Sequence, residues 1–176
     1  MLKNISIRFD PIEDRMALRM VVQSGSDAPQ EHWLHLTRRL CGVWRQDLQA
    51  MVDMSAQAPE RLDAPAKASI SQAHHQAMAR QAQVRTEPAP SPADGPTPQP
   101  VLVTRIVCGR RKADGRWLMR FERRDLPSLS LVLSSQTLHA LIDALTRRIQ
   151  SASWALPSLP FEQKALEQPS TATHLH

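Results

Sequence analysis

The feature of this sequence that most restricts its fold is a succession of apolar patterns that occurs twice, once before position 57 and once after position 100. Each copy contains three short stretches in which apolar and polar residues alternate, as they do in half-buried β-strands. A longer stretch then follows in which apolar residues recur every three or four positions, as on one face of an α-helix. The sequence therefore predicts an α+β protein of two pseudo-repeated βββα modules, in which antiparallel strands are backed by one helix in each module.

The expected strands of the first copy are residues 4–9, 15–22 and 32–36 (NISIRF, RMALRMVV and HWLHL). The helix that follows is expected to begin after Thr37, because threonine is a favoured N-cap residue. The apolar face of this helix consists of Cys41, Trp44, Leu48 and Val52. Three strands and one helix make a thin core, so we expect each copy to need the other as a second layer.

The second copy repeats this order, with strands expected at residues 104–109, 116–121 and 129–133 (TRIVCG, RWLMRF and LSLVL). Ser134 or Ser135 is expected to cap its helix. The apolar face of that helix consists of Leu138, Leu141, Ile142, Leu145 and Ile149. The two copies could form one continuous six-stranded sheet or two sheets related by a pseudo-twofold axis.

Two constant offsets superimpose the copies. An offset of 101 places Arg15 on Arg116. After a loop that is four residues longer in the first copy, an offset of 97 places Thr37 on Ser134. We interpret this match as a duplication; the alternative is that any two segments with the same order of elements align in this way, because the pattern follows the period.

The segments outside the copies differ from them in composition. Residues 57–86 are rich in Ala and Gln and are expected to form a helix. Residues 87–100 contain six prolines and are expected to be a flexible linker. Residues 157–176 show no apolar periodicity and are expected to be a disordered tail. The predicted domains are the modules at residues 1–56 and 101–156, with these three segments between and after them.

Positive charge is concentrated in the second copy. The whole chain has a formal net charge of +5, yet residues 1–58 contain seven Lys or Arg and seven Asp or Glu. Residues 101–156 contain ten basic and four acidic residues, which makes a net charge of +6. Such an excess favours an anionic partner, for example nucleic acid.

The lack of a recognisable targeting signal and the small number of cysteines predict a cytoplasmic protein. No apolar stretch has the length of a signal peptide or a membrane-spanning helix, so we expect a soluble, unexported chain without a membrane partner. The two cysteines, Cys41 and Cys108, fall at interior positions of the expected elements. We predict that they are small buried thiols rather than a disulfide or a redox pair.

No motif indicates catalysis or a cofactor. His74 and His75 would point about 100° apart on a helix and lack a carboxylate or Cys four positions away, so they are expected to be solvated rather than metal-binding. His139 and Asp143 could form a hydrogen bond, but no Ser or Cys nucleophile can be placed beside them. The five glycines do not have the spacing of a phosphate-binding loop. The prediction is a non-enzymatic protein with no cofactor, no metal and no small-molecule substrate.

The candidate site is the outer face of the expected strands. If the Met, Trp and Phe residues of these strands face the core, alternation sends their arginines to the opposite face. Guanidinium groups bind phosphate, and an exposed Trp can stack on an unpaired base. The alternative is a solvated sheet face, where the long arginine stem covers apolar surface. The residues predicted to bind nucleic acid or another partner are Arg8, Arg15, Arg19, Trp33, His35, Arg105, Arg110, Arg111, Lys112, Arg116, Arg120, Arg123 and Arg124.

Two functions are compatible with these patterns. The first is a binding protein that holds single-stranded or structured nucleic acid on the basic sheet face. In topology alone, a repeated strand-rich unit that ends in one helix resembles the PUR-repeat and Whirly single-strand-binding proteins, which have four strands in each unit. The second function is an adaptor or structural subunit of a protein assembly, in which the arginine face meets an acidic protein surface or a second copy of the chain.

Overall fold

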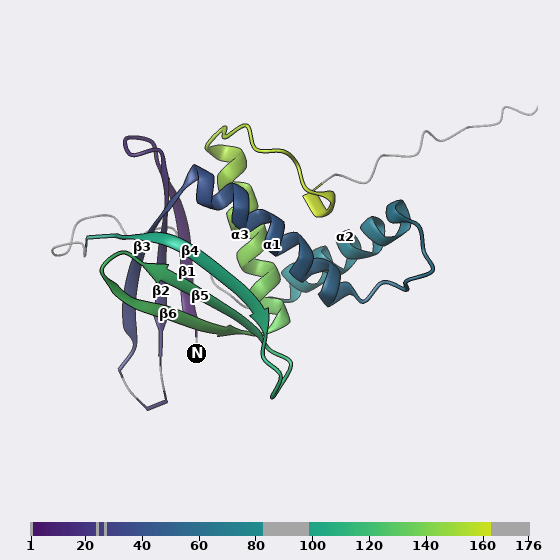
Figure 1. Cartoon of the computed structure of the whole chain (residues 1–176), viewed down its shortest axis with the longest axis horizontal. Helices are drawn as coiled ribbons and strands as arrows, with labels where there is room; N and C mark the ends of the chain where they lie inside the picture. Colours follow the sequence, from purple (N-terminus) through teal and green to yellow (C-terminus); the bar gives the residue numbers. More distant parts are fainter. Residues whose placement is uncertain (1, 24, 27, 83–98, 163–176) are drawn as a thin grey trace, which may run out of the picture.

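The computed structural model describes residues 2–23, 25–26, 28–82 and 99–162 of the chain. Within these residues the chain is an α+β protein with a six-stranded mixed sheet and three α-helices (Figure 1). The strands are β1 (Leu2–Asp10), β2 (Arg15–Val22), β3 (Gln30–Thr37), β4 (Val101–Arg110), β5 (Trp117–Arg123) and β6 (Leu126–Leu133). The helices are α1 (Arg38–Ala56), α2 (Ala64–Gln81) and α3 (Ser135–Ser151), followed by the short 3₁₀ turn η1 (Pro160–Glu162).

The six strands lie side by side in the order in which they occur in the chain, so they belong to one continuous sheet. Neighbouring strands are antiparallel except at the centre, where β3 and β4 run parallel. The central ladder is short, since within the described residues it pairs Leu34 with Val101 and His35 with Leu102 and extends no further. Below, β1–β3 with α1 are called the first unit, and β4–β6 with α3 the second unit.

Strand pairing follows the period-2 alternation of the sequence. On the inner face of the first unit, Leu18 of β2 lies between Ile7 of β1 and Leu34 of β3. All three side chains are buried. The corresponding inner residues of the second unit are Cys108, Met119 and Leu131.

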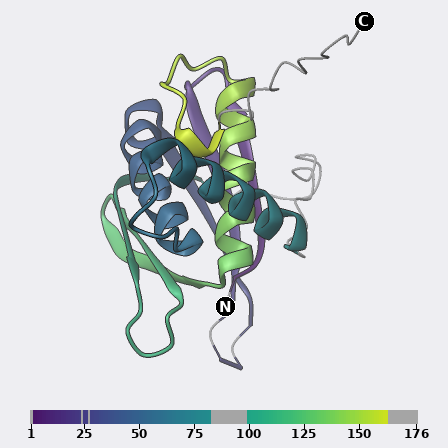
Figure 2. The ribbon, with the colours of Figure 1, turned by 90° about the vertical axis from the view of Figure 1, so that its right-hand side faces the viewer.

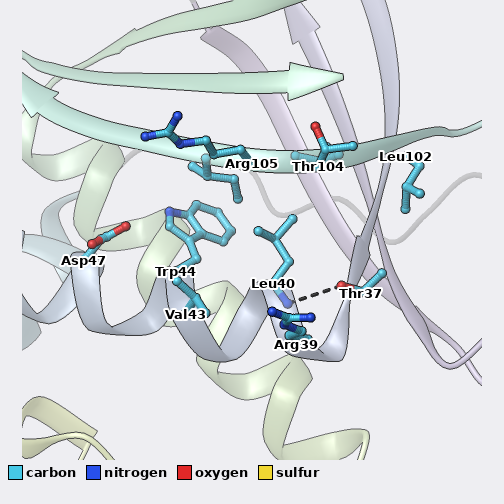
Figure 3. Close-up of a pocket in the computed structure, with 11 residues that line it drawn as sticks. Thr37, Arg39, Leu40, Val43, Trp44, Asp47, Leu102, Thr104 and Arg105 are labelled. Carbon is cyan, nitrogen blue, oxygen red and sulfur yellow. Dashed lines mark hydrogen bonds between the residues drawn. The ribbon is translucent and has the colours of Figure 1, made fainter. Parts of the chain in front are cut away.

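Two layers of helices cover the inner face of the sheet. Helix α1 contacts β3 and β4, α3 contacts β6 and β1, and α2 packs across α1 and α3 (Figure 2). The sheet is curled, so its two outermost strands, β1 and β6, come into contact. The side chain of Trp44 extends from α1 toward β4 (Figure 3). Its indole contacts Phe121 edge to face, with the ring centres 5.8 Å apart. This arrangement buries one apolar core shared by both units.

The same capping chemistry marks both transitions from strand to helix. Thr37 Oγ1 accepts a hydrogen bond from the backbone N–H of Leu40 at 3.2 Å. Ser134 Oγ accepts one from the backbone N–H of Thr137, also at 3.2 Å. The predicted helix starts are confirmed, and Ser134 rather than Ser135 is the cap of α3.

The helix expected between the modules is α2, and it packs on the other helices and on η1 rather than on the sheet (Figure 1). Asp63 caps its start by accepting a hydrogen bond from the backbone N–H of Ala66 at 2.9 Å. Part of its contact with α1 is polar, because Ser71 Oγ donates to Asp53 Oδ1 at 2.7 Å. The weak apolar pattern of this segment reflects such polar docking. The Pro-rich linker lies outside the described residues, apart from its last two positions.

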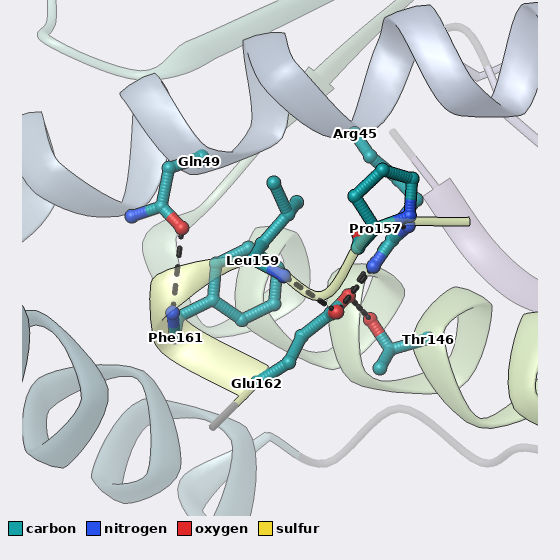
Figure 4. A network of polar contacts seen from close by, with 7 residues as sticks. All are labelled: Arg45, Gln49, Thr146, Pro157, Leu159, Phe161 and Glu162. Atoms are coloured by element: carbon teal, nitrogen blue, oxygen red, sulfur yellow. Dashed lines mark hydrogen bonds and ion pairs between the residues drawn. The ribbon is translucent and has the colours of Figure 1, made fainter.

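The segment after α3 corrects the prediction of a disordered tail from residue 157. The turn η1 within residues 157–162 lies against α2 and α1, and Phe161 is buried beside His75 of α2. The carboxylate of Glu162 forms an ion pair with Arg45 of α1 (Figure 4). Both side chains are nearly inaccessible to solvent. Residues 163–176 of the predicted tail lie outside the described residues.

Neutral groups complete this network around the ion pair. Glu162 Oε1 accepts a hydrogen bond from Thr146 Oγ1 at 3.3 Å, and Arg45 Nη1 donates to the carbonyl oxygen of Pro157 at 2.9 Å (Figure 4). The backbone N–H of Phe161 donates to Gln49 Oε1 at 3.3 Å. Individual contacts rather than a periodic apolar face therefore hold this segment.

The cysteines are free thiols, as predicted, with Cys41 buried and Cys108 half-buried. Burial raises the pKa of Cys41 to about 12 and that of Cys108 to about 11. Neither side chain is therefore a reactive thiolate at neutral pH. Among the described residues, the helices are too short or too polar to cross a membrane.

Candidate functional site

The outer face of the first unit brings Arg8, Arg19 and Trp33 together. The two guanidinium carbons lie 5.7 Å and 5.9 Å from the centre of the indole ring. The indole N–H donates to Glu31 Oε1 at 2.6 Å, and Arg19 Nε donates to the same oxygen at 2.6 Å. These neighbours leave Trp33 only 8% exposed. The expectation of an exposed Trp on this face is therefore wrong, although the predicted register is correct.

The other predicted residues of this face, Arg15 and His35, lie beside the carboxylate of Glu13. Arg15 Nη1 lies 3.1 Å from Glu13 Oε2, and His35 Nδ1 lies 3.9 Å from the same oxygen. Burial lowers the pKa of His35, so this ring is neutral at pH 7. Glu13 and Glu31 thus offset the charges of Arg15 and Arg19. The first unit has its arginines where the pattern places them, but little uncompensated positive charge.

The outer face of the second unit carries Arg105, Arg116 and Arg120, and all three are exposed. Arg116 Nε lies 3.7 Å from Asp114 Oδ2, and Arg120 Nη2 lies 3.5 Å from Glu122 Oε1. Ion pairs with this exposure contribute about 0–1 kcal/mol. These arginines can therefore exchange their present partners for an incoming anion at little cost.

Two predicted site residues help to hold the hairpin between β4 and β5. Arg110 Nε donates to the carbonyl oxygen of Gly115 at 2.9 Å, and its guanidinium carbon lies 5.5 Å from the centre of the Trp117 ring. Arg111 forms an ion pair with Asp114, and this contact lowers the pKa of Asp114 to about 2. The roles of Arg110 and Arg111 in the structure are thus local, because both close the turn.

Positive charge nevertheless exceeds negative charge on this hairpin. Residues 105–125 contain eight Lys or Arg and three Asp or Glu. In the part of the chain that the structure describes, Arg105 and Lys112 make no ion pair. Arg123 Nε donates to a neutral carbonyl oxygen at 2.7 Å, and Arg124 makes an exposed ion pair of 3.8 Å. Of the predicted basic surface, the part on the second unit therefore keeps an excess of positive charge.

A groove between α1 and β4 is a further candidate site, with a volume of about 670 Å³. Its walls are largely apolar and include Leu40, Val43, Trp44, Leu102, Val103 and Ile106 (Figure 3). The sequence does not indicate this groove, because the groove depends on where β3 ends relative to β4. A local sequence pattern cannot predict the relative position of two strands that are far apart in the sequence.

Three helices bring together a buried polar cluster that the sequence also does not indicate. His75 Nδ1 lies 2.8 Å from His139 Nδ1, and Ser55 Oγ lies 3.0 Å from His74 Nε2 and 3.2 Å from His139 Nε2. The expectation of a solvated His75 is wrong, since this residue is 6% exposed. A serine does lie beside His139, and Asp143 instead pairs with an arginine.

Electrostatics make this cluster a poor catalytic centre. Burial, assisted by the neighbouring histidines, lowers the pKa of His139 to about 3. Burial also lowers the pKa of His75. A general base works best with a pKa near the working pH, which His139 does not have.

Neither metal-binding geometry nor similarity to other proteins assigns a function. Among the described residues, no group of three or more His, Cys, Asp or Glu side chains is arranged to hold a metal ion. Comparisons with protein-family models, curated proteins and solved structures found no match. The function is therefore inferred from the charge and shape of the described surfaces.

Proposed function

We propose that this chain is a non-enzymatic binding protein that holds single-stranded or structured nucleic acid on the outer face of the second unit. The observation that carries the proposal is the composition of residues 105–125, where eight Lys or Arg stand against three Asp or Glu. Basic side chains neutralise phosphates and release counterions, which supplies much of the affinity of nucleic-acid-binding proteins. The arginines of this face are exposed and weakly paired, so they can engage phosphates.

The first unit is expected to contribute little to this binding. Glu13 and Glu31 would repel phosphate, and the ring of Trp33 is covered by its neighbours. Binding would therefore depend on phosphate contacts more than on base stacking, with little preference for base identity. If the five uncompensated positive charges each neutralise one phosphate of a single strand, the slope of log K against log salt is roughly −3 to −4.

We also propose that the two units arose by duplication of one βββα unit, and that nucleic-acid binding is a specialisation of the second copy. An offset of 101 converts the pairing of Ile7 with Leu18 into the pairing of Cys108 with Met119. An offset of 97 relates the two helix caps in the same way. The helix contacts correspond as well, because α1 lies on β3 and β4 while α3 lies on β6 and β1.

Fluorescence anisotropy with a labelled thymidine oligonucleotide, measured across a salt series, tests the binding proposal. The double variant Arg116→Ala with Arg120→Ala is expected to weaken binding at low salt and to flatten the salt slope by about 1 to 2. The matched control is Arg15→Ala with Arg19→Ala, at the equivalent positions of the first unit, and it is expected to leave the slope unchanged. Circular dichroism of both variants checks that they fold.

Two results would contradict the proposal. One is the absence of binding by the unmodified chain at low salt. The other is an equal loss of affinity in the two double variants, because the binding face would then not be that of the second unit. A labelled RNA stem-loop, titrated in parallel, distinguishes a single-stranded from a structured ligand.

A further inference from the structure

One edge of β4 is covered by another strand over only a short length. Strand β3 ends at Thr37 and pairs with β4 at Val101 and Leu102. From Val103 to Arg110, β4 pairs with β5 on one side and with no strand among the described residues on the other. Backbone N–H and C=O groups along an open edge are the groups that an added strand would bind.

The groove between α1 and β4 runs along the part of this open edge that extends from Val103 to Ile106 (Figure 3). Its volume of about 670 Å³ lies within the range of roughly 300–1,000 Å³ that is typical of ligand sites. Leu40 and Trp44, one helical turn apart, point from α1 toward β4 in the same view. Val43 also lines the groove, and this large apolar side chain is 56% exposed. The groove therefore offers apolar contacts beside an unpaired strand edge.

A buried polar atom in the wall of the groove lacks a partner. The indole N–H of Trp44 has no hydrogen-bond acceptor among the described residues. It lies near the thiol of Cys108, where it partly opposes the rise in the pKa of that thiol caused by burial, but the two do not form a regular hydrogen bond. In Figure 3 the nitrogen lies on the side of Asp47 and Arg105. This nitrogen is inaccessible to solvent, so a ligand carbonyl would satisfy the donor only after a movement of the side chains around it.

The charged residues of the groove favour an acidic ligand. Arg39 of α1 and Arg105 of β4 both line it and are both exposed. Neither makes an ion pair within the described part of the chain. Asp47 is the acidic residue among those that line the groove. Two unpaired guanidinium groups against one carboxylate favour a ligand that carries carboxylates of its own.

We propose that this groove binds an extended peptide segment of a partner protein, which adds to β4 as a strand and carries alternating apolar and acidic side chains. Its apolar side chains lie against Leu40 and Val43, and its carboxylates face Arg39 and Arg105. Strand addition to an open edge, with neighbouring pockets for alternate side chains, is a recurring mode of peptide recognition. The inference goes beyond nucleic-acid binding, because of the residues predicted for that face Arg105 alone lines the groove.

Amide chemical shifts of the isotope-labelled full chain, followed during peptide titration, test this proposal. The probes are three hexapeptides in which glutamate alternates with valine, leucine or phenylalanine. At least one is expected to shift the amide signals of residues 103–110 and of residues 39–47. The same peptide with alternate backbone amides N-methylated cannot donate to a strand edge and is expected to bind at least tenfold more weakly. Lysine in place of glutamate is expected to have a similar effect, because of Arg39 and Arg105.

Two pairs of variants locate the peptide on the groove. Val43→Glu places a carboxylate in the apolar wall and is expected to weaken binding about tenfold or more. Its matched control is Met54→Glu, on the same helix outside the groove lining and 50% exposed, which is expected to leave binding unchanged. Arg39→Glu is expected to weaken binding, whereas Arg148→Glu, an exposed arginine of α3, is not.

The proposal is overturned if none of the three peptides shifts these amides, or if the N-methylated peptide binds as well as its parent. It is also overturned if Val43→Glu and Met54→Glu behave alike. An oligonucleotide that shifts the amides of the β4 edge and displaces the peptide would assign the groove to nucleic acid instead. The Arg116→Ala, Arg120→Ala double variant separates the two proposals, because it is expected to lose oligonucleotide affinity and to keep peptide affinity.

Discussion

The two units share their strand pairing and differ in what their outer faces offer to a ligand. In the first unit, Glu13 and Glu31 hold Arg15 and Arg19 in close ion pairs. In the second unit, the arginines at the equivalent positions are themselves more exposed, and their ion pairs are longer. Alternation thus sets the face of the sheet on which an arginine lies, whereas the neighbouring side chains decide whether its charge is available to a ligand.

A second difference lies where each helix meets the first strand of the other unit. Helix α3 contacts β1 and carries Ala140 and Ala144, whereas α1 contacts β4 and carries Val43 and Asp47 at the equivalent positions. Small side chains let a helix lie close to a strand, and larger ones hold it away. The position of the groove beside β4 is consistent with this difference.

The largest expected effect comes from a buried helix position that is Arg45 in the first unit and Ile142 in the second. Arg45 is 5% exposed, so Glu162→Ala would leave its charge buried without a partner. The free energy of unfolding is expected to fall by about 3–5 kcal/mol, measured by denaturant titration. The combination of Arg45→Ile with Glu162→Leu imitates the second unit and is expected to recover most of this loss. A double variant as unstable as Glu162→Ala would contradict the interpretation.

A smaller effect is expected from His139, which occupies the position of Gly42 in the first unit. Its pKa is about 3 in the folded chain, against an ordinary value of 6.5. Between these values the unfolded chain binds the proton more readily, so stability is complete above pH 6.5 and falls as the pH decreases toward 3. At pH 5.5 the loss is at most about 1.4 kcal/mol, which is smaller than the loss expected for Glu162→Ala. Urea titrations over this range are expected to show a shallower loss for His139→Gln, and an unchanged pH dependence would exclude His139 as its source.

The smallest effect is expected from removing the carboxylates that distinguish the outer face of the first unit from that of the second. Glu13→Gln with Glu31→Gln removes the carboxylates that offset Arg15 and Arg19. If neutralisation is what distinguishes the faces, the first unit is expected to acquire phosphate contacts and the salt slope of oligonucleotide binding to steepen by about 1 to 2. Anisotropy measures this slope. No change would mean that the difference between the faces lies in shape rather than in charge.

The strands, the two main helices and their caps could be predicted from the sequence, because each has a local period or a local capping residue. Trp33 is a residue for which alternation predicts the face of the sheet but not the burial. Its place on the outer face follows from alternation, but its burial depends on side chains that converge on the ring. Glu31, two positions earlier on the same face, was a local sign that the indole N–H would find an acceptor within the protein.

The parts that could not be predicted depend on contacts between distant elements. Phe161 and Glu162 lie in a segment without periodicity and are held by individual side chains of α1, α2 and α3. The buried cluster takes Ser55 from α1, His74 and His75 from α2, and His139 from α3, and only the packing of the three helices brings these side chains together. Local sequence patterns do not predict contacts between elements that are far apart in the chain.

Helix α3 and strand β1, which are far apart in the sequence, can meet only after most of the chain has been made. α3 packs against β1, and just beyond α3 the indole N–H of Trp154 donates to Asp14 Oδ1 at 2.6 Å, across 140 positions of sequence. The Trp154 ring also meets Phe9 edge to face, with the centres 5.7 Å apart. Contacts of such long range form late, because the loop must first be closed. During synthesis the first unit therefore emerges with part of its apolar face uncovered, and this face stays uncovered until α3 has been made.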